Sequence, residues 1–335
     1  MRKITLLLIA SYLIAACSSS KNKENKEANP IDYAKTITAD ELKDMLYTYA
    51  SDEYEGRKTG EPGQKKAIEF IKNHYIANKI PSPIAEGDYF QEIPESFFNG
   101  HVNAASENVL AYIKGSEKPD EIIVISAHLD HIGVTQNGEI NNGADDDGSG
   151  TVAVLEIAEA FKTAANNGHG PKRSILFLHV TGEEIGLYGS KYYTDVDPVF
   201  PLENTVANLN IDMIGRIDPK HENNPNYLYL IGSDKLSKEL HDLSEAVNKQ
   251  YINMTFDYTY NAINDPNRFY YRSDHYNFAK NNIPVIFYFN GTHADYHQPT
   301  DTPDKIEYEL LATRTQLIFY TAWELANREE RIKLD

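Results

Sequence analysis

Cysteine is almost absent from this sequence, because Cys17 is the only one among 335 residues. The folded chain can therefore contain no internal disulfide. Basic residues are also scarce, since 32 lysines and arginines stand against 50 aspartates and glutamates and leave a net charge of −18. Such an acidic surface argues against nucleic acid as a partner.

Long hydrophobic runs are missing as well, apart from a short apolar stretch at residues 4–16. This stretch follows Arg2 and Lys3 and is too short for a comfortable membrane span, which is typical of a secretory signal. It ends in LIAAC, which resembles a bacterial lipobox, so we expect residues 1–16 to be removed and Cys17 to carry a lipid. The polar segment at residues 17–30 lacks apolar periodicity and predicts a flexible tether.

These features predict an extracytoplasmic, lipid-anchored protein that faces the periplasm or the cell surface. The lipid on Cys17 would be its only link to the membrane. An ordinary cleaved signal followed by an incidental cysteine is the alternative.

Beyond residue 30 the sequence alternates between strand and helix patterns. Apolar, β-branched runs predict strands at residues 108–115, 121–128, 173–182, 205–215, 226–232 and 283–289. Apolar residues at helical spacing predict helices at residues 38–49, 63–78, 150–165, 235–250 and 306–332. This alternation predicts an α/β fold, a single three-layer α/β/α domain over residues 31–335 with a mostly parallel, twisted central sheet. We expect the N-terminal helices, within residues 31–100, to pack on that same domain.

The segment GADDDGSG, at residues 143–150, places three acids in a row. Five residues match positions 1, 3, 5, 6 and 12 of a calcium-binding EF-hand loop: Asp145, Asp147, Ser149, Gly150 and Glu156. An EF-hand loop needs a helix on each side, but here a strand and turns come first, and the next helix starts inside the supposed loop. An acid cluster at a strand-to-helix crossover instead indicates a ligand site of an open α/β sheet.

Other carboxylates and imidazoles also collect where predicted strands end. His128 and Asp130 are two residues apart on an extended backbone, so they point to the same side. This spacing suits a metal-bound imidazole that a carboxylate orients, although the same pair could simply cap a strand end. His131 follows directly and is expected to point elsewhere, so it is left out of the site.

Two further strands end in acids. Glu183 and Glu184 are adjacent and diverge, so one can bind a metal while the other stands off across a water molecule, although acids also favour a helix N-terminus. Asp212 lies among apolar neighbours and needs a cation, either a metal or Arg216, because an unpaired buried carboxylate is costly.

A histidine completes the set in the loop before the last predicted helix. His297 is the candidate, with Thr300 and Asp301 close enough in sequence to orient it, and His293 competes for the same role. Two histidines and three carboxylates at separate strand ends match the mixed ligation of a two-metal hydrolytic site, whose ions lie ~3.5–4 Å apart.

With these residues in place, the chain resembles the co-catalytic di-zinc aminopeptidases, the group of aminopeptidase Y and the peptidase-like domain of glutamate carboxypeptidase II. The resemblance begins at YEGRKTGEPGQKKAIEFI, from residue 54, and extends to the last helix. Its motifs stand in the family order AHLDH, GADDDGSG, TGEEIGLYGS, NIDMIG, SDHYNF and YHQPTDT. It implies a zinc-exopeptidase fold of the phosphorylase/hydrolase-like type and an enzyme that removes N-terminal residues from peptides with a free N-terminus.

The resemblance also implies two zinc ions per chain and assigns their ligands. Asp146 would bridge both ions, and the peptide bond after it is often cis in the family. The remaining ligands divide between the ions, with His128 and Asp212 on one, and Glu184 and His297 on the other.

The same resemblance assigns the other catalytic roles. Glu183 would be the general base, while Asp145 and Asp147 would shape the loop. We also count Asp130, the carboxylate expected to orient His128, among the catalytic residues. Arg268, Tyr271 and Arg272 precede the SDH motif and are candidates for the specificity pocket, with a packing role as the alternative for the tyrosines of this segment. Ser273, Asp274 and His275 are expected to support the site.

Two other functions remain open on this fold. A glutaminyl cyclase is a single-zinc transferase, and a lipid-anchored binding protein would keep the fold without catalysis. The segment TGEEIGLYGS favours the peptidase, because it keeps an acid able to act as base next to an acid able to bind metal.

Overall fold

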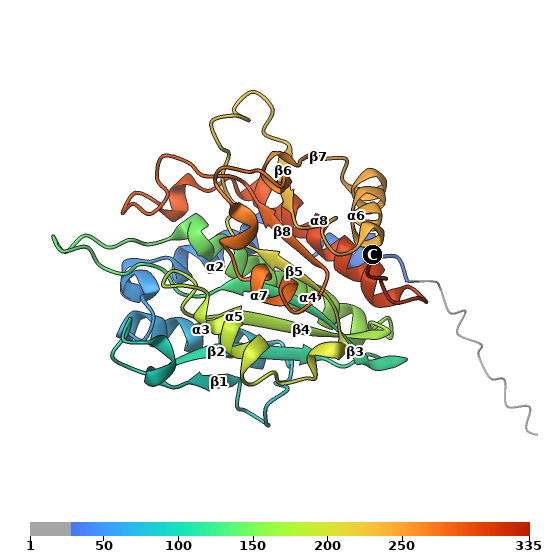
Figure 1. Ribbon diagram of the computed structural model, residues 1–335, viewed down its shortest axis with the longest axis horizontal. Helices are drawn as coiled ribbons and strands as arrows, with labels where there is room; N and C mark the ends of the chain where they lie inside the picture. The colour runs from blue at the N-terminus through green and yellow to red at the C-terminus, as the bar shows by residue number, and fades with distance from the viewer. Residues whose placement is uncertain (1–27) are drawn as a thin grey trace, which may run out of the picture.

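Eight strands form one twisted sheet in the computed structural model, which describes residues 28–335 (Figure 1). The strands are β1 Phe90–Ile93, β2 Ser106–Ile113, β3 Lys118–His128, β4 Arg173–Val180, β5 Thr205–Ile211, β6 Tyr227–Ile231, β7 Thr255–Asp257 and β8 Val285–Phe289. Their order is β1-β2-β4-β3-β5-β8-β6-β7. Of the seven pairings, the four between β4 and β3, β3 and β5, β5 and β8, and β6 and β7 are parallel. The predicted α/β fold with a mostly parallel sheet is therefore confirmed.

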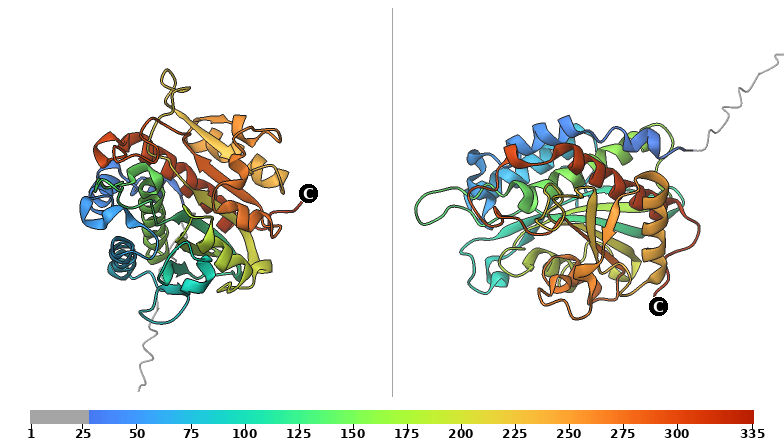
Figure 2. Two further views of the ribbon diagram at one scale, coloured as in Figure 1. Left: turned by 60° about the vertical axis from the view of Figure 1, so that its left-hand side comes forward. Right: turned by 90° about the horizontal axis from the view of Figure 1, so that it is seen from above.

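Helices cover both faces of this sheet (Figure 2). They are α1 Ile31–Ala34, α2 Ala39–Tyr49, α3 Pro62–Ala77, α4 Gly150–Asn166, α5 Tyr188–Asp195, α6 Lys238–Tyr251, α7 His275–Ala279 and α8 Tyr308–Asn327. Helices α1 to α4 lie with α8 on one face, and α6 packs against α8. Helices α5 and α7 contact each other and cover the opposite face.

Strand β3 shows why the strand patterns are continuous apolar runs rather than alternating ones. Ile123 and Ile125 point into the core under α4 and α8, while Ile122 and Val124 point into the core under α5 and α7. Both faces of a central parallel strand are buried, so every position favours an apolar side chain. Burying each such side chain stabilises the fold by about 1.5–3 kcal/mol.

Specific hydrogen bonds account for the start of α2 and the end of α8. Thr38 caps α2, because its hydroxyl oxygen accepts a hydrogen bond from the amide of Glu41 (3.2 Å) and its hydroxyl donates to the Glu41 carboxylate (2.7 Å). Helix α8 ends at Asn327, five residues earlier than predicted, because the buried guanidinium of Arg173 binds the carbonyl oxygens of Leu325, Arg328 and Glu329.

The sequence patterns did not predict the short strands β1 and β7 at the two edges of the sheet, or helices α1, α5 and α7. Residues 1–27, with the predicted signal and most of the predicted tether, lie outside the described part of the chain. Within residues 28–335, no helix is both long and apolar enough to cross a bilayer.

Candidate metal centre

The side chains predicted for the site gather at the downstream ends of four neighbouring strands. His128 ends β3, the two glutamates follow β4, Asp212 follows β5, and His297 lies in the segment after β8. The order β4-β3-β5-β8 makes these ends adjacent, since the pairings among them are parallel. Asp146 enters from the helical segment Ala144–Ser149, which leads into α4.

His128, Asp146 and Asp212 form a first group of possible ligands. The Nε2 atom of His128 lies 3.1 Å from Oδ1 of Asp146 and 3.7 Å from Oδ1 of Asp212. The Nδ1 atom of His128 lies 3.0 Å from the backbone carbonyl oxygen of Asp130. A carbonyl can only accept, so Nδ1 carries the proton and the lone pair of Nε2 points into the group.

Glu184 and His297 form a second group with the same aspartate. The Nε2 atom of His297 lies 3.1 Å from Oδ2 of Asp146 and 3.1 Å from Oε2 of Glu184. Asp146 thus offers one oxygen to each group, and its peptide bond to Asp147 is cis, as the family resemblance implied.

The hydrogen bonding of these groups fits metal ions. Among the described residues, His128 Nε2 and Asp146 Oδ2 are buried and have no hydrogen-bond partner. Buried polar atoms normally have one, so both atoms are ready to contact a cation. Imidazole nitrogen and carboxylate oxygen are the ligands that zinc accepts in hydrolytic sites.

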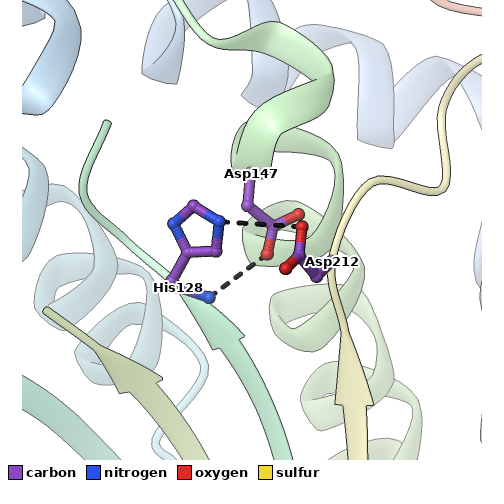
Figure 3. Close-up of side chains that lie close together, drawn as sticks. All are labelled: His128, Asp147 and Asp212. Atoms are coloured by element: carbon purple, nitrogen blue, oxygen red, sulfur yellow. Dashed lines mark hydrogen bonds and ion pairs between the residues drawn. The ribbon is translucent and has the colours of Figure 1, made fainter. Parts of the chain in front are cut away.

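Asp147 lies beside His128 and Asp212 as well (Figure 3). Its carboxylate, however, accepts hydrogen bonds from three backbone amides: those of His128 (3.2 Å), Gly150 (2.9 Å) and Met213 (3.1 Å). Both of its oxygens are therefore engaged, whereas Asp146 keeps one free. The hydrogen bonding therefore favours Asp146 as the candidate ligand and Asp147 as support for the loop.

Asp145 also has internal partners, which excludes the calcium loop. Its carboxylate accepts hydrogen bonds from the amide of Gly215 (2.7 Å) and the hydroxyl of Ser149 (3.0 Å), and β3 rather than a helix precedes the loop. His293 places Nε2 3.1 Å from Oδ2 of Asp145, so it serves this aspartate and does not join the second ligand group.

Asp301 has a different role from the predicted one. Its carboxylate accepts hydrogen bonds from the amides of Asp145 (3.0 Å) and Asp146 (3.2 Å) instead of orienting His297. The ring of His297 stacks on Tyr296, with 3.9 Å between the ring centroids.

Asp212 and Arg216 do not pair. The guanidinium of Arg216 binds Asp295 (2.9 Å), while Asp212 accepts a hydrogen bond from the hydroxyl of Ser273 (2.6 Å). A metal is therefore the better of the two cations proposed for Asp212, and Ser273 supports the site as expected.

His131 was wrongly left out of the site. Its Nδ1 lies 2.6 Å from Oε1 of Glu184 and 3.8 Å from Oδ2 of Asp146, and its buried Nε2 has no partner among the described residues. The alternation argument failed because β3 ends at His128, so His131 lies beyond the strand, where it forms an isolated parallel bridge with Lys58. The repeated histidine of HLDH, directly after a strand end, was the signal that could have identified it.

Asp130 contacts the site differently from the predicted His–carboxylate pair. Its carboxylate oxygens accept hydrogen bonds from the hydroxyl of Thr59 (2.7 Å) and from the amide of Glu183 (3.2 Å), and the nearer of them to His128 Nδ1 lies 3.8 Å away. The backbone of Asp130 therefore orients His128, while its side chain holds the backbone of Glu183.

Burial and neighbouring charges separate the acids of the site. Burial raises the pKa of Glu183 well above its usual range, and the nearby Asp212 and Glu184 carboxylates add to this. Burial also favours the protonated form of Asp146, but the adjacent imidazoles of His128 and His297 outweigh this effect and hold the pKa of Asp146 well below its usual range. Asp146 is thus ionised, as metal binding would require, and Glu183 has a raised proton affinity.

A cavity opens onto these acids. It is lined by Asp146, Glu183, Glu184, Asp212, Met213, Phe269, Arg272, Phe287, Phe289, Thr292 and Tyr296. Of the residues predicted for specificity, Arg272 lies in this lining, with its guanidinium 4.8 Å from the ring centroid of Phe269. Arg268 instead stacks on the exposed Tyr271, 4.9 Å from its ring centroid.

Comparisons with known proteins agree with this geometry. A sequence model described as Peptidase family M28 matches residues 108–322. The chain is 24% identical over 351 residues to Aminopeptidase YwaD of Bacillus subtilis (strain 168), covering 96% of this chain and 72% of that protein. It is 30% identical over 256 residues to Leupeptin-inactivating enzyme 1 of Streptomyces exfoliatus, covering 75% of this chain but only 48% of that protein.

Solved structures share the fold. LapA aminopeptidase of Legionella pneumophila superposes with a TM-score of 0.68 at 20% identity, covering 91% of this chain and 79% of that chain. BSAP, a zinc aminopeptidase from Bacillus subtilis, superposes with a TM-score of 0.67 at 16% identity, covering 88% and 96%. At these identities the likeness shows the fold, a three-layer α/β domain.

Proposed function

This chain belongs to peptidase family M28, and from that premise we propose that it is a zinc-dependent aminopeptidase with two zinc ions per chain. The observation that carries the proposal is Asp146, which offers one carboxylate oxygen to each of two ligand groups. His128 and Asp212 complete the first group, and Glu184 and His297 complete the second. Relatives and structural neighbours that bear the name aminopeptidase support the reaction class.

Bound zinc would supply a water molecule of lowered pKa and a polarised substrate carbonyl. Glu183 lines the cavity beside both groups, and its backbone amide is fixed by Asp130. We propose that its carboxylate takes the proton of the attacking water and then returns it to the leaving amine. The high proton affinity that burial gives Glu183 suits a group that must hold this proton between the two steps.

The substrates we propose are peptides with a free N-terminus. Four carboxylates line the cavity, from Asp146, Glu183, Glu184 and Asp212, and an α-ammonium group would be attracted to them. The acidic net charge of −18 argues against nucleic acid as an alternative substrate.

We further propose that the enzyme acts outside the cytoplasm, held to a membrane by a lipid on Cys17. This proposal rests on the apolar stretch and the LIAAC sequence at the N-terminus, followed by a polar segment that ends at residue 30.

The proposed function can be tested with purified wild type and Glu183→Gln on a panel of aminoacyl chromogenic substrates. The expected result is turnover by wild type and a decrease in kcat of about 10²–10⁴-fold in the variant, with equal zinc content in both. A matched set of N-acetylated substrates serves as the control and should not be hydrolysed. One zinc ion per chain, together with formation of pyroglutamate from glutaminyl peptides, would contradict the peptidase and favour the cyclase.

A further inference from the structure

Arg57 is a fully buried cation close to the metal centre, and none of the proposed roles uses it. It ends the short helical segment Asp52–Arg57, within the EGR sequence of the first motif. Among the described residues, no carboxylate lies within ion-pair distance of its guanidinium. Burying a charge without a counter-ion is costly, so its other contacts must compensate.

Those contacts are backbone carbonyl oxygens on both sides of the site. The guanidinium donates from Nε to the carbonyl of Leu129 (3.2 Å), from Nη1 to that of Asn142 (2.6 Å) and from Nη2 to that of Gly143 (2.8 Å). A longer fourth hydrogen bond runs from Nη1 to the carbonyl of Tyr49 (3.4 Å). Leu129 directly follows His128, and Gly143 directly precedes the Ala144–Ser149 segment that carries Asp146.

We propose that Arg57 is a positioning residue that fixes the distance between the end of β3 and the Ala144–Ser149 segment, and thereby between His128 and Asp146. This inference rests on the proposed two-zinc function. The planar guanidinium can donate in several directions at once from one rigid group, which a lysine ammonium on a flexible stem cannot reproduce.

Tyr49 reinforces the same contact. Its ring lies 4.6 Å from the guanidinium carbon of Arg57, and its hydroxyl donates to the carbonyl of Leu129 (2.8 Å). The Arg57 guanidinium and the Tyr49 hydroxyl thus both donate to the carbonyl of Leu129, and the Tyr49 ring also packs against the cation.

Asp301 binds the backbone amides of the loop, whereas Arg57 binds backbone carbonyl oxygens next to it. The carboxylate of Asp301 accepts hydrogen bonds from the amides of Asp145 and Asp146, whereas Arg57 donates to the carbonyls of Asn142 and Gly143. The Asp301 carboxylate thus binds backbone donors and the Arg57 guanidinium binds backbone acceptors. Together they fix the backbone from Asn142 to Asp146.

The backbone around Arg57 follows the same loop. The amide of Gly133 donates to the carbonyl of Gly56 (3.0 Å), and the amide of His131 donates to that of Arg57 (3.3 Å). A Cβ atom at Gly56 would lie 2.5 Å from the carbonyl oxygen of Asn141, so the backbone at Gly56 packs too closely for any larger residue. Arg57 itself has a φ of 48°, in the left-handed region.

The test is a titration of the metal-free full chain with Co²⁺, comparing wild type with Arg57→Lys. Substitution of residues that position metal ligands typically lowers metal affinity about 10–100-fold. We therefore expect the Co²⁺ dissociation constant of Arg57→Lys to exceed that of wild type by about this factor. The visible absorption of bound Co²⁺ should also change, because it reports ligand geometry. A role limited to stability would lower the melting temperature of the metal-free chain and leave both readouts unchanged, which would overturn the proposal.

Arg173→Lys is the matched control. Arg173 is also fully buried and donates to three carbonyl oxygens at the C-terminal end of α8, although it differs from Arg57 in pairing with a carboxylate, that of Glu121 (2.5 Å). This variant should lose stability and keep the Co²⁺ affinity and spectrum of wild type. If Arg173→Lys changed the spectrum as strongly as Arg57→Lys, the proposal would also fail.

Tyr49→Phe covers the case in which Arg57→Lys does not fold. It removes only the hydroxyl that binds the Leu129 carbonyl, so a smaller shift in the same direction is expected, and wild-type behaviour would overturn the proposal. Fewer than two Co²⁺ ions per wild-type chain would contradict the two-metal function and this inference with it. Two ions in wild type with no change in either variant would contradict this inference alone.

Discussion

The ligand face of the site and the shell behind it are both rich in buried acids, but they differ in what those acids contact. The proposed ligand face comprises His128, Asp146, Glu184, Asp212 and His297, with His131 against Glu184. The supporting shell comprises Arg57, Asp145, Asp147 and Asp301. Asp147 uses both oxygens to accept backbone amides, whereas Asp146 keeps a buried oxygen with no partner among the described residues. Unmet hydrogen-bonding capacity therefore marks His128 and Asp146 at the centre of the ligand face, and satisfied capacity marks the acids of the shell.

The three successive aspartates show that residue type alone does not assign these roles. Asp145, Asp146 and Asp147 have the same side chain and lie in one short segment. Their different backbone directions bring two of them to backbone amides and leave the middle one between two histidines. The comparison predicts that changes on the ligand face affect metal binding and activity most directly, while changes to the shell acids Asp145, Asp147 and Asp301 mainly affect the stability of the metal-free chain.

The largest effect is expected for Asp146→Ala, which removes the oxygens shared by both ligand groups. Metal ions stabilise the transition state of such reactions by several kcal/mol, so kcat/KM should fall by about a hundredfold or more. The metal-free variant should lose less stability than metal-free Asp147→Ala, because no buried backbone amide loses its acceptor. Steady-state kinetics and thermal unfolding in chelator measure the two quantities. A variant that unfolds at much lower temperature than metal-free wild type would place Asp146 in the shell.

Removal of metal from wild type comes next in size. Zinc that binds only the folded state stabilises it by about 2.7 kcal/mol at a hundredfold excess over Kd and by about 4.1 kcal/mol at a thousandfold excess. Thermal unfolding with and without chelator should show this difference for wild type and for Asp147→Ala. The Asp146→Ala chain is the control and should not respond to the chelator.

Asp147→Ala tests the shell itself. Its loss leaves three buried backbone amides without acceptors, and an unsatisfied buried group costs about 1–3 kcal/mol. Chemical denaturation of the metal-free chain should therefore give a lower free energy of unfolding than for metal-free wild type. Equal values for the two chains would contradict the assignment of Asp147 to the shell.

The smallest effect concerns Glu156, a buried acid of α4 that lies outside both regions. Burial raises its pKa to about 8, and the charges of Glu41 and Glu159 add to the effect. The folded state thus binds the proton more tightly than the unfolded state. The contribution of Glu156 to the free energy of unfolding is therefore fully present below about pH 4.5 and is lost as the pH rises through about 8.

Glu156→Gln should therefore be more stable than wild type above pH 8, by about 1 kcal/mol once residual hydration of the carboxyl is allowed for. At pH 4 the two chains should unfold alike. Denaturation midpoints across this range provide the measurement, and a constant difference between the chains at all pH values would contradict the pKa shift as its cause.

Much of this architecture follows from the sequence because its physical causes are local. The β-branched run at residues 121–128 predicted β3, since a strand buried on both faces needs apolar side chains throughout. The ordered motifs, from AHLDH to YHQPTDT, named the ligands that the structure brings together. The edge strands β1 and β7 were missed because they are four and three residues long and leave little pattern.

The supporting contacts were harder to predict because they depend on distant parts of the chain. Arg57 meets carbonyl oxygens 72, 85 and 86 residues away, and backbone oxygens leave no trace in a sequence. Asp301 reaches amides more than 150 residues away. His131 was missed for a local reason, since the alternation of side chains ends with the strand.

The account depends most on the claim that Asp146 is shared by two metal ions. An anomalous-difference map from crystals grown with zinc tests it directly. We predict two peaks on either side of Asp146, one within bonding distance of His128 and Asp212 and the other of Glu184 and His297. A single peak, or a peak bound by Asp147 with Asp146 turned away, would contradict the claim.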